Sequence, residues 1–297
     1  MQVESPVRAS SRLRAFEVSP ALFRRLAIAA AAMLVVIVAT GATVRLTASG
    51  LGCEHWPGCQ PGDPFPKKGY HSYVEFSNRV VAFFTILVTL ATAVASLLTR
   101  VPRRVRWLAW GTFVGTLAQA PLGAITVYYH LNPWLVISHL LLSLVVLGAG
   151  VLLVSEVFAR PTPAAPALVR WGSLVALAAL CVLVVSGTIV SGSGPHPGGQ
   201  DVRRLTVFGD AIYWHVRATA VFGILFLGVL VWAARQRGWA LRDAVAVLGL
   251  LVLQMAIGEI QYRNALPWWL VLVHVTMAAA VWAAAVAFVS SIWRSRA

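Results

Sequence analysis

Charged residues are scarce in this chain, and acidic residues are the scarcest of them. Only 11% of the 297 residues are Asp, Glu, Lys or Arg, and only 10 are acidic, whereas 59% are hydrophobic. A soluble domain carries about a quarter charged residues, so this composition excludes an ordinary soluble globule. The chain is expected to lie in a lipid bilayer.

The hydrophobic residues are concentrated in eight runs. Each run has close to the ~20 residues that a bilayer-spanning helix requires. The runs cover residues 26–44, 80–98, 107–129, 134–154, 171–190, 215–233, 244–260 and 268–292. The sequence therefore predicts an all-α integral membrane protein with eight transmembrane helices.

The basic residues outnumber the acidic ones and give a formal net charge of +14. They stand in short segments beside the apolar runs, which is typical of membrane orientation and not of a nucleic-acid-binding patch. Placing the N-terminus inside puts most of them on the cytoplasmic side. We expect both termini to be cytoplasmic, residues 1–23 to form a flexible arm, and no nucleic acid to be a partner.

An internal repeat divides the chain into two halves. Four residues of the first half recur 135 positions later, and these pairs are Gln119 with Gln254, Gly123 with Gly258, Trp134 with Trp269 and His139 with His274. Because four helices separate equivalent elements, both halves keep one orientation in the membrane. We predict two pseudo-symmetric four-helix bundles at residues 24–158 and 171–293, an outer loop at 46–74 and a cytoplasmic linker at 159–170.

Three histidines lie in or at the mouth of apolar runs, where polar side chains are costly and usually functional. His139 and His274 each follow a Trp by five residues, which places them about 7 to 8 Å below the outer interface. His215 opens the sixth run from the same side. His215 and His274 could clamp a haem between two helices. The alternative is that the histidines only form hydrogen bonds between helices.

The first half offers a different set of residues. Helix four supplies His139, but Asn78 stands where helix two would supply the partner, and Asn is a poor iron ligand. Glu75, three residues earlier, is a candidate acid or base. Its alternative role is as a helix N-terminal acid or as an ion-pair partner of Arg79.

Arginines and cysteines complete the candidates. Arg45, Arg79 and Arg217 stand at outer helix ends and could neutralise carboxylates of a bound haem, although interfacial snorkelling also explains them. Cys53 and Cys59 lie in the first outer loop, where either a structural disulfide or a redox-active or metal-binding pair with His55 is consistent with the spacing.

Several of these residues together resemble one family. The stretch Gly41-Ala-Thr-Val-Arg-Leu-Thr-Ala-Ser-Gly-Leu-Gly-Cys53, the motif Glu75-Phe-Ser-Asn78-Arg79 and the repeated Trp-Leu-Val-x-x-His are similar to the haem A synthase family, over residues 24–292. The resemblance implies a cell-membrane protein, multi-pass, with haem sites toward the outer face. It also implies oxidation of the C8 methyl of haem O to the formyl group of haem A, for use in terminal oxidases.

The resemblance assigns roles residue by residue. His215 and His274 would bind the iron of a haem b cofactor in the second half, and His139 would bind the substrate haem O in the first. Glu75 would be the catalytic acid, and Cys53 with Cys59 would form a disulfide. Expected partners are haem O, haem O synthase, terminal oxidase assembly factors and an electron acceptor of unspecified identity.

Asn78 departs from the family pattern, because many relatives have a His at this place. Either the substrate iron is five-coordinate, or a loop residue such as His71 replaces the missing ligand, or catalysis does not require it. Two rival functions use similar features. A non-catalytic dihaem electron carrier of cytochrome b type, exchanging electrons with quinone, needs the histidines but not Glu75. A transporter would place its polar residues at the membrane midplane.

Overall fold

The computed structural model describes residues 17–53, 55–56, 58–66, 69–159, 165–199, 202–236 and 238–294. Over these residues the fold is entirely helical, with no β-strand. The eight helices are α1 (Pro20–Leu46), α2 (Tyr70–Leu98), α3 (Arg103–Tyr128), α4 (Pro133–Val157), α5 (Ala167–Ser193), α6 (Phe208–Gln236), α7 (Gly238–Arg263) and α8 (Trp268–Arg294). Most of the predicted arm 1–23, and residues 160–164 of the predicted linker, lie outside the described residues.

Polar caps and prolines set where the helices begin. Ser19 caps α1 by accepting a hydrogen bond from the backbone N–H of Leu22 at 3.2 Å, and Asn132 caps α4 by accepting one from Trp134 at 3.0 Å. A proline follows each cap, at Pro20 and Pro133. Proline suits the first helical turn, where its missing N–H has no partner to lose. The cap at Asn132 places His139 in the second turn of α4.

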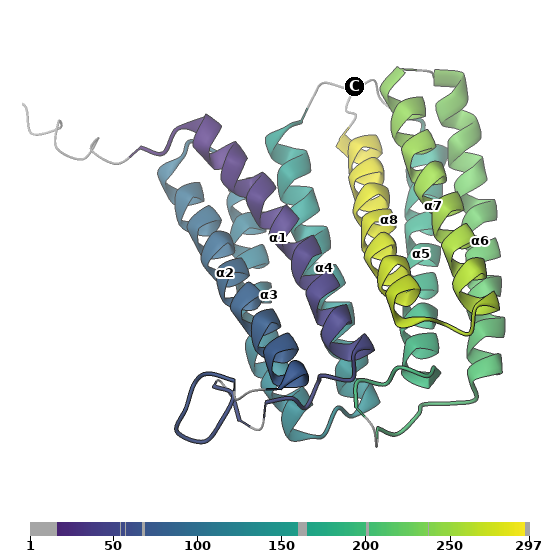
Figure 1. The fold of residues 1–297 in the computed structure, drawn as a ribbon. Coiled ribbons are helices and arrows are strands. Elements are labelled where there is room, and N and C mark those ends of the chain that lie inside the picture. The colour runs from purple at the N-terminus through teal and green to yellow at the C-terminus, as the bar shows by residue number, and fades with distance from the viewer. Residues whose placement is uncertain are drawn as a thin grey trace, which may run out of the picture.

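Seven of the eight helices are long and apolar enough to cross a membrane. The exception is α3, which has 26 residues but begins with basic residues and carries Gln119 and Pro121 among its glycines and threonines. Figure 1 shows α3 running beside α2 and α4 between the same two ends of the molecule. The prediction of eight helices is therefore confirmed, whereas the crossing by 107–129 stays a prediction.

Within each half, the helices pack in a closed ring. In the first half α1 contacts α2 and α4, and α3 contacts the same two helices; in the second half α5 and α7 each contact α6 and α8. The pairs α2 with α4 and α6 with α8 are therefore diagonal across their bundles. A side chain pointing inward from one diagonal helix faces the other across the bundle axis.

The two halves are packed against each other. Helices α1 and α4 contact α8, and α4 also contacts α5. Leu34, Leu147 and Ala279 are buried in one cluster at this junction, and the indole N–H of Trp282 in α8 donates to the carbonyl of Leu144 at 2.8 Å. The halves thus share a continuous apolar interface, with a buried backbone polar group satisfied across it.

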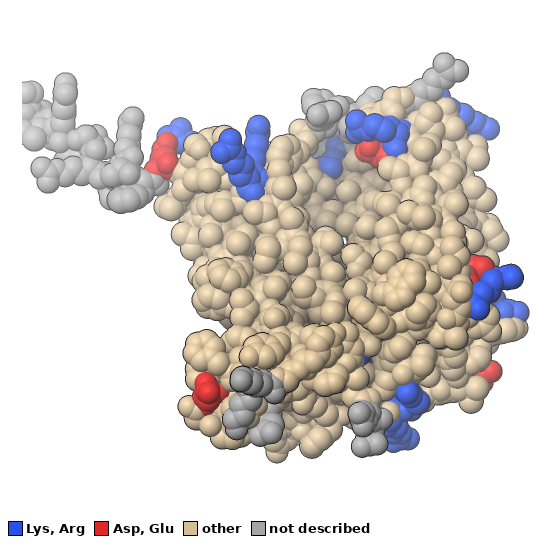
Figure 2. All heavy atoms as spheres, in the orientation of Figure 1, with Lys and Arg blue, Asp and Glu red and all other residues tan. Residues whose placement is uncertain are grey.

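The surface matches a lipid environment. Figure 2 shows the charged side chains gathered mainly toward the two ends, with a broad band of other residues between them. Large apolar side chains are exposed along the middle of the helices, among them Val145 of α4, Val182 of α5 and Ile224 of α6. Water would penalise such a continuous apolar surface, whereas lipid does not. The chain is a multi-pass membrane protein, with the start of α1 and the end of α8 at the end opposite the loop before α2 (Figure 1).

Candidate haem sites

The three intramembrane histidines and Asn78 lie near one end of the bundle. His139 stands in the second turn of α4, and His274 stands in the second turn of α8. His215 stands in the second to third turn of α6, and Asn78 stands in the third turn of α2. All four helices begin at the end that carries the loop between α1 and α2. At about 1.5 Å per residue, each of the four lies about 9 to 12 Å inside its helix start. The sequence-based expectation of a common depth agrees with these positions.

The second half brings two histidines together. His215 on α6 and His274 on α8 lie on diagonal helices, at similar distances from the starts of those helices. The hydroxyl of Ser186 on α5 lies 2.9 Å from Nδ1 of His215. A partner at Nδ1 orients the ring and leaves Nε2 for a metal. Two histidines at similar depth on diagonal helices are compatible with bis-histidine haem ligation.

A glycine on a neighbouring helix faces each imidazole. A Cβ at Gly258 would lie 3.0 Å from Cε1 of His274, and a Cβ at Gly187 would lie 3.1 Å from Cε1 of His215. Both distances are tighter than ordinary carbon contacts, so only glycine lets the helix backbone approach the ring this closely. The glycines form the wall of a cradle that holds each imidazole in place.

Glutamines on the neighbouring helices α7 and α3 contact the backbone of His274 and His139. The amide of Gln254 donates to the carbonyl of His274 at 3.0 Å, and the amide of Gln119 donates to the carbonyl of His139 at 3.3 Å. The Oε1 atoms of both glutamines and the Nδ1 atoms of both histidines are buried without a partner among the described residues. A ligating histidine normally donates its second N–H to an acceptor. Among the described residues neither of these Nδ1 atoms has such a partner, and of the three histidines only His215 has one, at Ser186.

The donor set also restricts the kind of metal. Among the described residues, no group of three or more His, Cys, Asp or Glu side chains could hold a metal ion. A bare zinc or iron ion needs more protein ligands than this. Haem iron needs only one or two, because the porphyrin supplies the other four. The residues present fit haem at His215 with His274, and at His139.

Glu75 is buried against the outer loop, with 5% of its surface exposed. Its Oε2 accepts a hydrogen bond from the backbone N–H of Cys53 at 2.8 Å, and its Oε1 accepts one from Arg79 at 2.6 Å. Arg79 also donates to the carbonyls of His55 at 2.7 Å and Gly58 at 2.5 Å. The ion pair that the sequence offered as an alternative is present, and both residues hold the loop.

The loop is closed by a disulfide between Cys53 and Cys59, whose Cα atoms are 4.4 Å apart. This confirms the predicted pairing. Because both sulfur atoms are in the bond, they do not form a thiol pair with His55. The loop packs on the start of α2, where Ser72 donates to the carbonyl of Gly52 at 2.7 Å. The disulfide loop thus forms a wall beside Glu75.

The three candidate arginines have different surroundings and do not form one cluster. Arg79 is engaged by Glu75 and the loop, and Arg217 is exposed and stacks on Tyr213. Arg45, at the end of α1, donates to the carbonyl of Ser191 at the end of α5, so it links the two halves. Their proposed contact with haem carboxylates stays a prediction.

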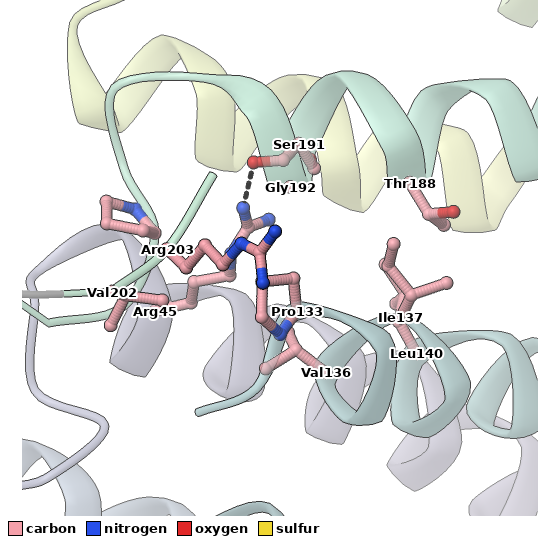
Figure 3. A pocket seen from close by; sticks show the side chains of 11 residues that line it. Arg45, Pro133, Val136, Ile137, Leu140, Thr188, Ser191, Gly192, Val202 and Arg203 are labelled. Atoms are coloured by element: carbon pink, nitrogen blue, oxygen red, sulfur yellow. Dashed lines mark hydrogen bonds between the residues drawn. The ribbon is translucent and has the colours of Figure 1, made fainter. Parts of the chain in front are cut away.

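Arg45 also lines a pocket between the halves. Figure 3 shows Arg45 and Arg203 pointing to the same place, above the apolar side chains of Ile137 and Leu140. The Nε of Arg45 is buried there without a partner among the described residues. None of the three intramembrane histidines lines this pocket, so we do not identify it with a haem site.

Comparison with known proteins agrees with this arrangement. The sequence profile of the cytochrome oxidase assembly protein family matches residues 24–68 and 64–196, which is more than half of the chain. The chain belongs to this family. The profile covers the disulfide loop, Glu75, Asn78 and His139, and it extends through α5 into the following loop.

Several curated relatives of this chain carry the name "Heme A synthase". A protein of Symbiobacterium thermophilum is 29% identical over 263 residues, covering 80% of this chain and 84% of the relative. One of Halalkalibacterium halodurans is 26% identical over 220 residues, covering 68% and 73%. One of Bacillus pumilus is 34% identical, but the match spans only 42% of this chain and 41% of the relative.

Sequence reasoning missed the residues that support the ligands. The Gln and Gly of the repeat were visible as a pattern, but their contacts with the histidines were not. Thr40-Gly41 and Ser186-Gly187 are a further pair, 146 positions apart, and only their contacts with Asn78 and His215 reveal them. A search for a hydroxyl residue followed by glycine near the ends of the first and fifth runs would have found this signal.

Proposed function

We propose that this protein is a haem A synthase, which oxidises the C8 methyl group of haem O to a formyl group. The observation that supports this most is the difference between the halves. The second half pairs two histidines, whereas the first pairs His139 with Asn78 and places the buried Glu75 one turn away. One half is built to hold a haem at both faces, and the other leaves one face open beside an acid.

The second half is the cofactor site in this proposal. His215 and His274 would hold haem b, which supplies one-electron transfer when bound. Ser186 would orient the imidazole of His215 and Gln254 would hold the backbone of His274, and Gly187 and Gly258 would let the neighbouring helices pack on the two rings. Two strong axial ligands leave no position for a substrate, which suits electron transfer.

The first half is the substrate site. Haem O would enter from the bilayer and rest with its iron on His139, between the diagonal helices α2 and α4. Gln119 would hold the backbone of His139 as Gln254 holds that of His274. The equivalent helix pairing in the two halves supports a pseudo-symmetric arrangement, in which the two haems lie side by side in one membrane leaflet.

With water as the oxygen source, conversion of the methyl group to a formyl group releases four protons and four electrons, and the electrons would pass one at a time through haem b to an external electron acceptor. A first hydroxylation replaces a C–H bond of the methyl group with a C–OH bond, and a second gives a geminal diol. Loss of water from the diol yields the aldehyde of haem A. Glu75 is a buried acid in this half of the chain. Its carboxylate would stabilise the positive charge that develops at that carbon, or would accept the released proton.

Glu75 also has a structural task, because it binds the backbone of Cys53 and the side chain of Arg79. The two roles are separable by a matched pair of variants. Glu75→Gln keeps an acceptor for Cys53 but loses the carboxylate, whereas Arg79→Gln breaks the same ion pair and keeps the carboxylate. If Glu75 acts in the reaction, Glu75→Gln loses haem A formation and Arg79→Gln retains much of it. Equal losses in both would leave Glu75 only the structural task.

The rival function is a dihaem electron carrier that exchanges electrons with quinone. The bis-histidine pair of the second half favours it, since such pairs are typical of electron-transfer haems. Under this function the buried Glu75 would keep only its structural task of holding Cys53 and Arg79. The names of the relatives and the family description favour the synthase. A haem O synthase and terminal oxidase assembly factors are the partners that this proposed function predicts.

The test is extraction and reversed-phase chromatography of the haems from protein produced in a host that makes haem O. The synthase predicts haem A together with haem b, and loss of haem A in His139→Ala with haem b retained. Haem b alone, with haem O unconverted, would support the electron carrier. Protein without any haem would refute both functions.

A further inference from the structure

Asn78 has the same kinds of neighbours as His215. The hydroxyl of Thr40 donates to Oδ1 of Asn78 at 2.7 Å, just as the hydroxyl of Ser186 lies 2.9 Å from Nδ1 of His215. The residue after each hydroxyl is the glycine that faces the same side chain, Gly41 for Asn78 and Gly187 for His215. By its contacts, Asn78 stands at the place of an axial ligand.

The carboxamide leaves space that an imidazole would fill. A Cβ at Gly41 would be 3.9 Å from Oδ1 of Asn78, with no other atom outside its own helix within 4 Å. The corresponding distance from Gly187 to the ring of His215 is 3.1 Å. The side chain of Asn78 is therefore shorter than this place accommodates, and the space beside it is open.

No other histidine replaces the missing ligand. His71 is seven residues before Asn78 on α2, which separates them by about 10 Å along the helix. It is exposed, and its Nδ1 lies 2.9 Å from the hydroxyl of Ser49. His71 thus belongs to the loop contacts, and the face opposite His139 has no second imidazole among the described residues.

The chemistry of the carboxamide points to a donor. An amide has one acceptor oxygen and two N–H donors, and the oxygen of Asn78 is already engaged by Thr40. The structure shows no partner for its Nδ2 among the described residues. A fixed N–H at an open coordination position stabilises a ligand atom that carries a lone pair or partial negative charge.

We propose that the first half contains a binding site for a small diatomic ligand, between a five-coordinate haem iron on His139 and the amide N–H of Asn78. Thr40 orients the carboxamide by holding its oxygen. The proposal rests on the proposed function, because it requires haem in the first half. It assigns Asn78 a role of its own, as a hydrogen-bond donor to whatever small ligand occupies the open face.

The experiment uses the full chain purified with its haems, with cyanide as the probe of ferric iron. The wild type should contain one haem that binds cyanide and one that does not. Asn78→His should convert the reactive haem to a low-spin form that no longer binds cyanide, at unchanged haem content. Asn78→Leu, of nearly the same shape, should still bind cyanide but about tenfold more weakly.

Two further variants control the result. Ser77→Ala alters the exposed neighbour of Asn78 on the same helix and should leave cyanide affinity unchanged. Thr40→Val keeps the carboxamide but removes its anchor, and should weaken cyanide binding severalfold. Unchanged affinity in both Asn78→Leu and Thr40→Val, or a wild type whose haems all resist cyanide, would overturn the inference.

The proposed function fails in a different way. If His139→Ala retains every haem and the same cyanide binding, then no haem lies on His139 and the first-half substrate site is refuted. If His139→Ala loses the cyanide-reactive haem while Asn78→Leu changes nothing, the site stands and only the role of Asn78 is lost.

Discussion

The carboxylate of Glu75 accepts a hydrogen bond from the backbone N–H of Cys53 at 2.8 Å, which joins α2 to a residue 22 positions earlier in the chain. Cys53 is at the same time bonded to Cys59. The disulfide loop and the candidate catalytic acid are therefore directly bonded to each other. A change in the loop should alter the position of the Glu75 carboxylate, and a change at Glu75 should alter the position of the loop.

Opening the disulfide should loosen this assembly. A loop of this length contributes about 2 kcal/mol in the chain-entropy description, so Cys53→Ser with Cys59→Ser should lower the melting temperature of the purified protein. Haem A yield should fall further than haem b content, because Glu75 loses a fixed partner while the second half is untouched. Thermal unfolding and haem extraction measure both. Equal loss of the two haems would mean that the loop supports the whole fold and not the first half.

Gly258 and Gly123 should respond differently to the same substitution. A Cβ at Gly258 would be 3.0 Å from the ring of His274, whereas a Cβ at Gly123 would be 3.5 Å from that of His139, which is an ordinary contact. Gly258→Ala should displace His274 and reduce low-spin haem per protein by half or more, and Gly123→Ala should retain its haem. Absorption spectra of equal protein amounts provide the comparison.

A third glycine is the control for helix propensity. Nothing lies within 4 Å of a Cβ at Gly223 in α6, so Gly223→Ala should keep all haem and gain up to about 1 kcal/mol of stability. Loss of haem in this variant would show that alanine harms these helices for reasons unrelated to the imidazoles.

Gln254 should matter for haem retention through His274. Its amide donates to the backbone carbonyl of His274 at 3.0 Å, and its buried Oε1 has no partner among the described residues. Gln254→Leu removes both groups at similar volume, and loss of such supporting contacts weakens metal binding about 10- to 100-fold. Transfer of haem to apomyoglobin, followed by absorbance, gives the rate. Gln254→Glu, which keeps an acceptor, should lie between; a rate in Gln254→Leu equal to that of the wild type would contradict the supporting role.

Leu147 and Val145 are a matched pair on α4. Leu147 is fully buried at the junction of the halves, whereas Val145 is 62% exposed toward the surrounding lipid. Leu147→Ala should cost about 2 to 5 kcal/mol because it leaves a cavity between α4 and its neighbours, and Val145→Ala should cost little. Unfolding in detergent measures the difference. Similar values for both variants would mean that the halves do not share a packed core.

Much of the architecture was readable from patterns with short range. Apolar runs of near-bilayer length predicted the helices, because lipid forces each span to satisfy its own backbone hydrogen bonds. Helix α3 is the informative exception to this hydropathy pattern, since it carries Gln119 and small residues among its apolar ones. It lies beside other helices that can shield these groups from lipid. Hydropathy averaged along the chain does not register this shielding, because it depends on neighbours from other parts of the sequence.

The candidate site divides in the same way. The recurrence of Gln, Gly, Trp and His after 135 residues identified His139 and His274 because a repeated function repeats its residues, and the spacing of the two cysteines allowed their bond. The sequence also showed that Asn78 stands where the repeat would place a histidine. Whether Glu75 pairs with Arg79, and whether Arg45 contacts the other half, remained open at that level.

Only the tertiary structure decided the contacts that join residues from different parts of the chain. Glu75 binds Cys53 across 22 positions of sequence, Arg45 binds Ser191 across 146, and Thr40 binds Asn78 across 38. The packing of the helices and the outer loop brings each pair to hydrogen-bonding distance. Side-chain identity determined what each group can donate or accept. The packing of α1 on α2 and of α1 near α5 determined which partner it meets.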